Sequence, residues 1–167
     1  VCFGELIATK IISAFLKKSN IKNNWVDSRS LIKTDANYRN ATVNWKATTF
    51  NCKQINLKKL QITQGFIGSD LKGNSTTLGR EGSDFTAGIL AYCLDAESVT
   101  IWKDVDGVLN ADPRVFENTV LLNQISYQEA IEMAFYGASV IHPKTIKPLE
   151  NKRIPLFVRS FDNLKNN

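Results

Sequence analysis

The feature that most constrains the fold of this chain is the alternation of helical and extended patterns along its length. Apolar residues recur at helical spacing over 6–16 and again over 85–94. Short runs rich in β-branched and aromatic residues separate such stretches, as in "SVTIWKDV" and "IPLFVRSF". Strands that alternate with helices are typical of a largely parallel sheet with both faces covered. The sequence therefore predicts an α/β fold in which polar loops gather beyond the carboxyl ends of the strands.

The clearest local signal is a helix over 127–136. Ser126 and Glu129 have the spacing of a capping box, an apolar face follows, and a glycine stands where the helix would end. Pro143 predicts the first turn of a further short helix. His142, directly before it, is interpreted as a structural N-cap or a packed ring. Both helices are expected to cover the sheet.

The middle of the chain gives weaker signals. The stretch "LQITQGFIG" predicts a brief strand that stops at Gly65 and Gly68. The next stretch, "SDLKGNSTT", predicts an exposed hairpin with Gly73-Asn74 in its turn. The residues over 33–59 are polar and weakly periodic, so we expect loops there with one helix near 50–60.

Composition excludes several classes of protein. With 167 residues, 43% apolar and 22% charged, the chain has the balance of one globular domain. It has no run of about 20 apolar residues, and "VCFGELIATK" lacks a secretion signal, so a cytoplasmic protein without a membrane partner is expected. Three cysteines without a CxxC pair indicate neither a disulfide framework nor a zinc site. The net charge of +5 comes from scattered lysines, which argues against a nucleic-acid partner.

Three polar loops begin where predicted strands end: "GFIGSD", "TTLGREGSD" and "KDVDGVLNADPR". In the second, Gly79 and Gly82 let the backbone approach a ligand, while Ser83 and Asp84 fall at a helix start, where free amide groups favour an anion. Arg80 offers a planar fork that can hold a carboxylate through two parallel hydrogen bonds. This loop is a candidate phosphate or carboxylate site. The alternative is a glycine-rich connection in which Ser83 is a simple N-cap.

The third loop concentrates charge. Its eleven residues from 104 to 114 include Asp104, Asp106, Gly107, Asn110, Asp112 and Arg114. That density of charged groups exceeds what a connection requires, which favours a binding role. Asp-Gly and Asp-Pro pairs also form turns for structural reasons, so both interpretations stay open at the level of the residues.

Together these segments resemble the aspartate kinases of the amino acid kinase family. The resemblance rests on "GFIGSDLKGNSTTLGREGSDFTAGILAYCLDAESVTIWKDVDGVLNADPR", then "SYQEAIEMAFYGASVIHPKTIKPL" and "IPLFVRSF", with "CFGE" near the start. It is weakest over 40–59. It implies a three-layer α/β/α sandwich around a mostly parallel sheet. It also implies transfer of the γ-phosphoryl group of ATP, with Mg²⁺, to the β-carboxylate of L-aspartate, the entry to lysine, threonine, methionine and isoleucine synthesis.

The resemblance assigns roles to the second loop and to the start of the chain. Arg80 matches the arginine that grips the α-carboxylate of aspartate, and Glu5 matches the acid that holds its α-amino group. Ser83 and Asp84 match the serine and aspartate beside the transferring phosphoryl group, with Asp84 organising the catalytic lysine. Phosphoryl transfer requires positioning and positive charge, so we expect no protein nucleophile.

The resemblance also implies a nucleotide site. Its contacts are expected at Lys103, Asp104, Leu109, Arg114, Ser139 and Val140. Lys103 stands where many members have threonine, Leu109 replaces a tyrosine common near the adenine, and Ser139 stands where many relatives carry a lysine. Because these three positions are expected to contact the nucleotide, the departures are expected to affect how tightly it binds.

The resemblance implies that residues 1–167 are a partial kinase domain, its carboxyl-terminal part. Aspartate kinases begin with a segment of the form "KFGGTS" that cradles the phosphates and supplies the catalytic lysine, and ACT domains that bind lysine or threonine usually follow. Neither is found in these residues, so we expect the chain alone to be inactive and the parent enzyme to be a homo-oligomer regulated by lysine or threonine. The alternatives are a kinase of glutamate or acetylglutamate, and a non-catalytic nucleotide-binding remnant.

Overall fold

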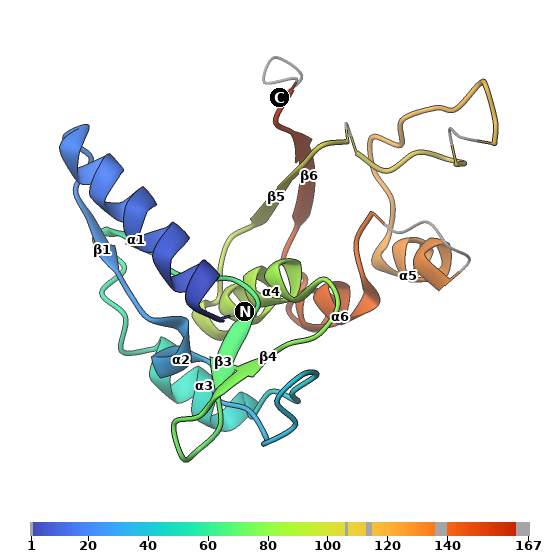
Figure 1. Ribbon diagram of the computed structural model, residues 1–167. Coiled ribbons are helices and arrows are strands. Elements are labelled where there is room, and N and C mark those ends of the chain that lie inside the picture. Colours follow the sequence, from blue (N-terminus) through green and yellow to red (C-terminus); the bar gives the residue numbers. More distant parts are fainter. Residues whose placement is uncertain (1, 106, 113–114, 136–139, 163–167) are drawn as a thin grey trace. The chain divides into compact units, whose positions relative to one another are not determined.

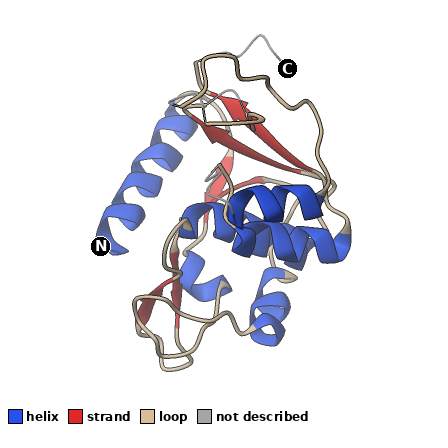
Figure 2. Ribbon diagram, turned by 90° about the vertical axis from the view of Figure 1, so that its right-hand side faces the viewer, coloured by secondary structure: helices blue, strands red, loops and turns tan. Residues whose placement is uncertain are grey.

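The structure is a computed structural model that describes residues 2–105, 107–112, 115–135 and 140–162. It consists of two compact units, Val1–Thr86 and Ala87–Asn167, which are described separately as the first and second units. Figure 1 labels the elements, and Figure 2 shows helices in blue and strands in red. In chain order the elements are α1 (Cys2–Lys18), β1 (Asn23–Trp25), α2 (Ser28–Leu31), α3 (Trp45–Cys52), β2 (Leu60–Ile62), β3 (Ile67–Ser69), β4 (Ser75–Thr77), α4 (Gly82–Leu94), β5 (Val99–Lys103), α5 (Tyr127–Phe135), α6 (Pro143–Lys152) and β6 (Leu156–Ser160).

The first unit contains two short strand pairs. β1 pairs with β2 in parallel. β3 and β4 form an antiparallel hairpin, in which the Asp70 carboxylate accepts hydrogen bonds from the N–H groups of Lys72 and Asn74 at 2.9 and 2.8 Å. The predicted hairpin turn at Gly73-Asn74 is confirmed. The single strand expected over "LQITQGFIG" is instead two strands, because Phe66 has a left-handed φ of 71° that interrupts the extended chain.

α1 confirms the helix predicted at the start of the chain. Lys17 and Lys18 lie in its last turn, where cations complement the helix dipole. Asn20 then adopts a left-handed φ of 62°, and the Ile21 N–H donates to the Leu16 carbonyl at 2.8 Å. This closure ends the helix at Lys18.

The helix expected near 50–60 lies instead at Trp45–Cys52. Asn44 starts it, because its side-chain oxygen accepts a hydrogen bond from the Ala47 N–H at 3.1 Å. Asn56 accepts a hydrogen bond from the Lys58 N–H at 3.0 Å, which favours a turn before β2. The predicted boundaries are wrong because two asparagine side chains bond the backbone, one as a cap and one in a turn.

The second unit is built around the parallel pair of β5 and β6. Val99 and Ile101 of β5 are buried, and they alternate with the exposed Thr100 and Trp102. The core of the unit consists of Ala91, Val99, Ile101, Ile141, Ile146, Leu149 and Ile154. Among the described residues, the parallel pairs β1–β2 and β5–β6 are each joined through helices, which confirms the predicted α/β class.

Two helix starts in the second unit confirm local predictions. The Ser126 N–H donates to the Glu129 carboxylate at 2.7 Å and the Glu129 N–H donates to Ser126 Oγ at 3.1 Å, a reciprocal capping box for α5. These bonds lower the pKa of Glu129. At the start of α6, His142 Nδ1 accepts a hydrogen bond from the Lys144 N–H at 3.1 Å. His142 is therefore the predicted structural N-cap.

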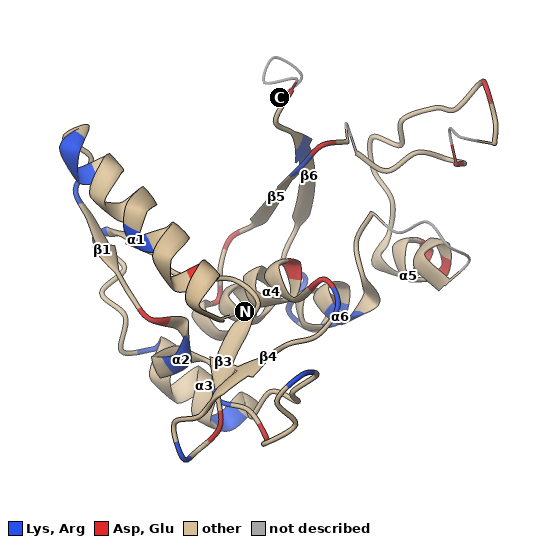
Figure 3. Cartoon of the chain, viewed as in Figure 1, with Lys and Arg blue, Asp and Glu red and all other residues tan. Residues whose placement is uncertain are grey.

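The cysteines and the basic residues lie on several elements. Cys52 and Cys93 are buried, Cys2 is half-buried, and all three are thiols. Figure 3 shows Lys and Arg spread over α1, α2, α6 and β6. Within the part of the chain that the structure describes, no helix has both the length and the apolar character needed to cross a bilayer.

Asp27 and Arg29 form an ion pair at the start of α2. Arg29 Nη2 lies 2.6 Å from Asp27 Oδ2, and Arg29 Nε lies 3.0 Å from Asp27 Oδ1. The Arg29 guanidinium holds the pKa of Asp27 below its usual value. A carboxyl group with a lowered pKa in the folded state stabilises the fold above its unfolded-state pKa of about 4, and this contribution is lost as the pH falls through the folded-state pKa.

We expect Asp27→Asn to lower the free energy of unfolding by about 1 kcal/mol at pH 7, because asparagine keeps the cap of α2 but loses a charge pair that is about a third exposed. At an acidic pH below this lowered pKa the carboxylate of the original protein becomes protonated, so the difference between the two proteins shrinks. Urea unfolding at both pH values measures this. An equal difference at the two pH values would show that the charge of Asp27 is not its source.

Candidate active site

The predicted anion-binding loop is a tight turn that leads into α4. Gly79 and Glu81 have left-handed φ values of 79° and 56°, and the Gly82 N–H donates to the Gly79 carbonyl at 3.1 Å. α4 begins at Gly82, so Ser83 and Asp84 lie in its first turn as predicted. Amide groups at this end of a helix lack partners within the helix and favour negative charge.

The side chains of this loop differ in their exposure. Arg80 and Ser83 are exposed and Asp84 is half-buried. The exposed guanidinium of Arg80 and the exposed hydroxyl of Ser83 are both accessible to a ligand, three residues apart on the turn and the helix start. The arrangement can hold a carboxylate with Arg80 and a second anionic group at the amino end of α4.

A second turn, at Gly65-Phe66, packs against the start of α4. A Cβ atom on Gly65 would lie 3.0 Å from the Cα and Cβ atoms of Ser83, so only glycine fits without displacing Ser83. The Phe66 N–H donates to Thr86 Oγ1 at 2.9 Å, and Thr86 Oγ1 donates to the Gly82 carbonyl at 2.8 Å. Thr86 thus fastens the turn to the helix. The sequence predicts Gly65 as the end of a strand and gives no signal for the role of Thr86.

A third segment, residues 38–41, supports the loop from β4. The Thr77 N–H donates to the Tyr38 carbonyl at 2.8 Å, and the Ala41 N–H donates to the Thr77 carbonyl at 2.9 Å. Asn40 approaches Gly79 so closely that a Cβ atom there would lie 2.4 Å from Asn40 Oδ1. From the sequence, these residues are expected only to form a loop. No periodicity or motif marks them, because their partners lie far along the chain.

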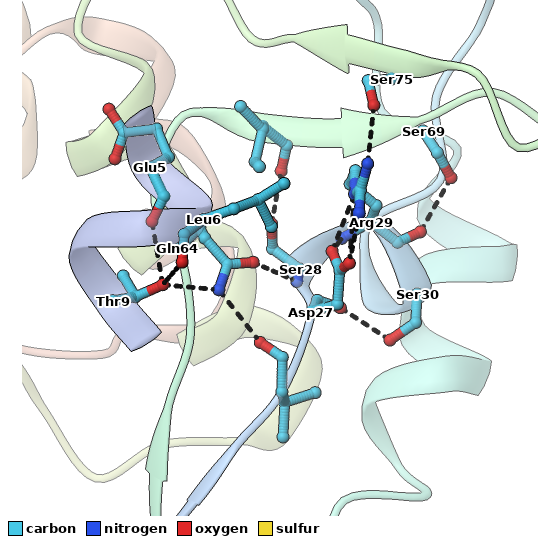
Figure 4. A network of polar contacts seen from close by, with 12 residues as sticks. Glu5, Leu6, Thr9, Asp27, Ser28, Arg29, Ser30, Gln64, Ser69 and Ser75 are labelled. Carbon is cyan, nitrogen blue, oxygen red and sulfur yellow. Dashed lines mark hydrogen bonds and ion pairs between the residues drawn. The ribbon is translucent and has the colours of Figure 1, made fainter. Parts of the chain in front are cut away.

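Glu5 lies in the same unit as Arg80, Ser83 and Asp84. It occupies the first turn of α1, its side chain is half-buried, and its carbonyl accepts a hydrogen bond from Thr9 Oγ1 at 2.9 Å. Figure 4 shows Glu5 and Thr9 on one stretch of α1 with Gln64 beside them. The first unit therefore contains all four residues predicted to bind the substrate and its phosphoryl group.

The residues predicted to bind the nucleotide belong to the second unit. Lys103 is the last residue of β5, and Asp104 follows it as an exposed carboxylate. Leu109 forms an antiparallel bridge with Leu121, so the loop after β5 returns on itself as a hairpin. Arg114, Ser139 and Asp106 lie outside the described residues.

Two cavities lie in the second unit. A small apolar pocket of about 90 Å³ is lined by Val140 together with Val108, Ile125, Met133, Ile141 and others. A larger cavity of about 720 Å³ lies along β6 and the segment 121–127, and Tyr127 at its wall donates a hydrogen bond to the Ile154 carbonyl. Burial raises the pKa of Tyr127. Val140 thus lines the small pocket, whereas Lys103, Asp104 and Leu109 line neither cavity.

Comparison with known proteins identifies the family. The model of the amino acid kinase family matches residues 1–160. The chain is 40% identical over 164 residues to lysine-sensitive aspartokinase 3 of Escherichia coli, covering 96% of this chain and 36% of that protein. It is 37% identical over 165 residues to a bifunctional aspartokinase/homoserine dehydrogenase of Buchnera aphidicola, covering 97% of this chain and 20% of that protein.

A solved structure gives the same result for the fold. The crystal structure of E. coli aspartokinase III in complex with aspartate and ADP matches with a TM-score of 0.91 and 39% identity, covering 97% of this chain and 37% of that one. The chain therefore spans little more than a third of the length of that enzyme. The match confirms the predicted α/β fold of this family. Because the family model covers residues 1–160, the chain belongs to the amino acid kinase family.

Proposed function

We propose that the protein containing this chain transfers the γ-phosphoryl group of ATP to the β-carboxylate of L-aspartate. The observation that supports this most is the match at 39% identity and a TM-score of 0.91 to an aspartokinase that binds aspartate and ADP. The loop with Arg80, Ser83 and Asp84 at the amino end of α4 supplies the groups that such a substrate requires.

Aspartate is held through its α-groups in this proposal. The exposed guanidinium of Arg80 takes the α-carboxylate through two parallel hydrogen bonds, and the carboxylate of Glu5 takes the α-ammonium. Ser83 completes the contact to the substrate at the helix start. With both α-groups held, the length of the side chain determines whether the second carboxylate reaches the phosphoryl donor.

The phosphoryl group is transferred at the start of α4. Amide groups of the helix start favour the developing negative charge, and Asp84 orients the lysine that offsets it. Among the described residues no group of three His, Cys, Asp or Glu side chains is arranged to hold a metal ion. We expect Mg²⁺ to be held chiefly by nucleotide phosphates, with one or two carboxylates such as Asp84 nearby, where it would neutralise phosphate charge.

The nucleotide is assigned to the loop after β5. Lys103 and Asp104 follow the strand, Leu109 lies on the returning hairpin, and Val140 lines the apolar pocket. Arg114 and Ser139 complete the proposed contacts. A polar strand end and an apolar pocket in the same unit suit a nucleotide, whose phosphates and base need different surroundings.

We further propose the setting of the whole enzyme. Residues 1–167 form part of an aspartate kinase catalytic domain in a cytoplasmic homo-oligomer. An effector such as lysine or threonine regulates it, as the name of the lysine-sensitive E. coli relative suggests for that protein.

The test is substrate selectivity of the protein expressed from the full open reading frame that contains this sequence. We expect ADP release with L-aspartate and a much lower kcat/KM with D-aspartate and L-glutamate, because Arg80 and Glu5 hold the α-groups and so limit the reach of the side chain. A coupled ADP assay with each amino acid measures this. Equal turnover of L-glutamate would identify a glutamate kinase instead, and no turnover with any amino acid would identify a non-catalytic nucleotide-binding protein.

A further inference from the structure

Gln64 is a fully buried polar residue that the chemistry of the active site does not use directly. Its side chain has 0% exposure, and it lies between β2 and β3, next to Gly65. Its Oε1 atom accepts a hydrogen bond from the Ser28 N–H at 2.8 Å, and its Nε2 atom donates to Thr9 Oγ1 at 2.8 Å (Figure 4). Gln64 therefore connects α2 and α1 in the interior of the first unit.

The hydroxyl group of Thr9 is the next link. It accepts hydrogen bonds from Gln64 Nε2 at 2.8 Å and from Trp25 Nε1 at 3.0 Å. A hydroxyl group has one proton and two acceptor sites, so its own proton is left for the carbonyls of the preceding turn, of which Glu5 at 2.9 Å is nearer than Leu6 at 3.3 Å. The bonds of Thr9 thus hold the turn of α1 that carries Glu5.

The other neighbour of Gln64 is the loop at the start of α4. Gly65, the next residue, abuts Ser83, since a Cβ atom at position 65 would lie 3.0 Å from the Cα atom of Ser83. Phe66 is bonded to Thr86 of α4. Gln64 therefore lies between Glu5 on one side and Ser83 on the other, and all of these residues belong to the first unit.

A buried amide is a specific choice at this position. An apolar side chain would fill the same volume without needing hydrogen-bond partners, whereas a buried amide stabilises only the arrangement in which its partners are in place. Such a residue fixes the position of the elements it joins. The residue it fixes here with a predicted chemical role is Glu5.

We propose that Gln64 is a positioning residue that acts through Thr9. It holds the turn of α1 that contains Glu5 in the place where the Glu5 carboxylate can bind the α-ammonium group of the substrate. The proposal rests on the function proposed above. Because only the contact to the α-ammonium group of aspartate is affected, we expect a change in the KM for aspartate and none in the KM for ATP.

The decisive variant is Thr9→Val in the protein from the full open reading frame. Valine has the shape of threonine but removes the acceptor that Gln64 Nε2 and Trp25 Nε1 share, and Gln64 Nε2 keeps only its longer bond to the Val26 carbonyl at 3.4 Å, so the turn with Glu5 shifts. We expect the KM for L-aspartate to rise about tenfold, while kcat and the KM for ATP stay within about twofold. Thr9→Ser keeps the hydroxyl group and is expected to restore the original KM. Gln64→Met removes the hydrogen bond to Thr9 by changing its donor. We again expect the KM for L-aspartate to rise and the KM for ATP to stay within about twofold.

Two further readouts separate positioning from general damage. Succinate has both carboxylates of aspartate but no α-ammonium group, so its inhibition constant should be the same for Thr9→Val and the original protein. In a Glu5→Gln background the Thr9→Val change should add no further rise in the KM for aspartate, because the group it positions is already lost.

Thr48→Val is the matched control. Thr48 is also fully buried in the first unit, and its Oγ1 accepts a hydrogen bond from the Lys33 N–H at 3.0 Å and donates to the Lys33 carbonyl at 3.3 Å, away from α1. This change should lower thermal stability and leave the KM for aspartate unchanged.

If the original protein does not turn over aspartate, the proposed function fails. If the original protein is active, the positioning role is contradicted by an unchanged KM for aspartate in Thr9→Val, or by equal rises in Thr48→Val or in the KM for ATP.

Discussion

Asp84→Asn is expected to lower kcat with L-aspartate by about 10²- to 10³-fold, with a much smaller change in KM. Asparagine has nearly the same size as aspartate, so the first turn of α4 keeps its shape. The change removes the carboxylate of Asp84. We propose that this carboxylate orients the catalytic lysine beside the phosphoryl group during transfer. Removing one preorganised electrostatic partner from a transition state has effects of this size. Steady-state ADP release from the full-length protein measures both constants.

Asp95→Asn is the matched control for this change, at the other end of the same helix. Asp95 is exposed, forms an ion pair with Lys152, and has a left-handed φ of 52° that asparagine also adopts readily. Loss of this surface pair should cost at most about 1 kcal/mol of stability and leave kcat unchanged. A kcat for Asp84→Asn within a few fold of the original would show that Asp84 is only a structural acid.

Arg80→Lys is expected to raise the KM for L-aspartate about 30- to 150-fold. Lysine keeps the positive charge but loses one of two parallel, charge-assisted hydrogen bonds and the planar geometry of the guanidinium, a loss of about 2 to 3 kcal/mol. Because Arg80 is exposed on the turn before α4, the change should not affect folding. Initial rates over a range of aspartate concentrations, at saturating ATP, measure this.

Arg39→Lys provides the control for Arg80. Arg39 is also exposed and lies on the segment that borders β4, where its carbonyl accepts a hydrogen bond from Thr77 Oγ1 at 2.9 Å. Only its backbone takes part in that contact, so the side-chain change should leave the KM for aspartate unaltered. Unchanged saturation by aspartate in Arg80→Lys would mean that Arg80 is merely a surface charge.

Local sequence signals predicted those parts of the molecule whose hydrogen bonds close within a few residues. The capping box of Ser126 and Glu129, the N-cap at His142 and the hairpin turn at Gly73-Asn74 all bond neighbours along the chain. The start of α4 at Gly82 belongs to the same class in one respect, because the Gly82 N–H bonds the Gly79 carbonyl within the turn before the helix. The start of α3 at Asn44 was missed although its cap is local, since its signal is a single side chain.

The α/β class, the helix with Ser83 and Asp84 at its start, and the resemblance that pointed to Glu5 and Arg80 all follow from the amino-acid sequence. The contacts that hold these residues in place are found only in the folded chain: Gly65 against Ser83, Asn40 against Gly79, and Gln64 bonded to Thr9. Such contacts escape sequence patterns because their partners lie far apart along the chain. Gln64 and Thr9 are 55 residues apart, and no periodicity or spacing indicates which buried amide will meet which hydroxyl group until the chain has folded around both.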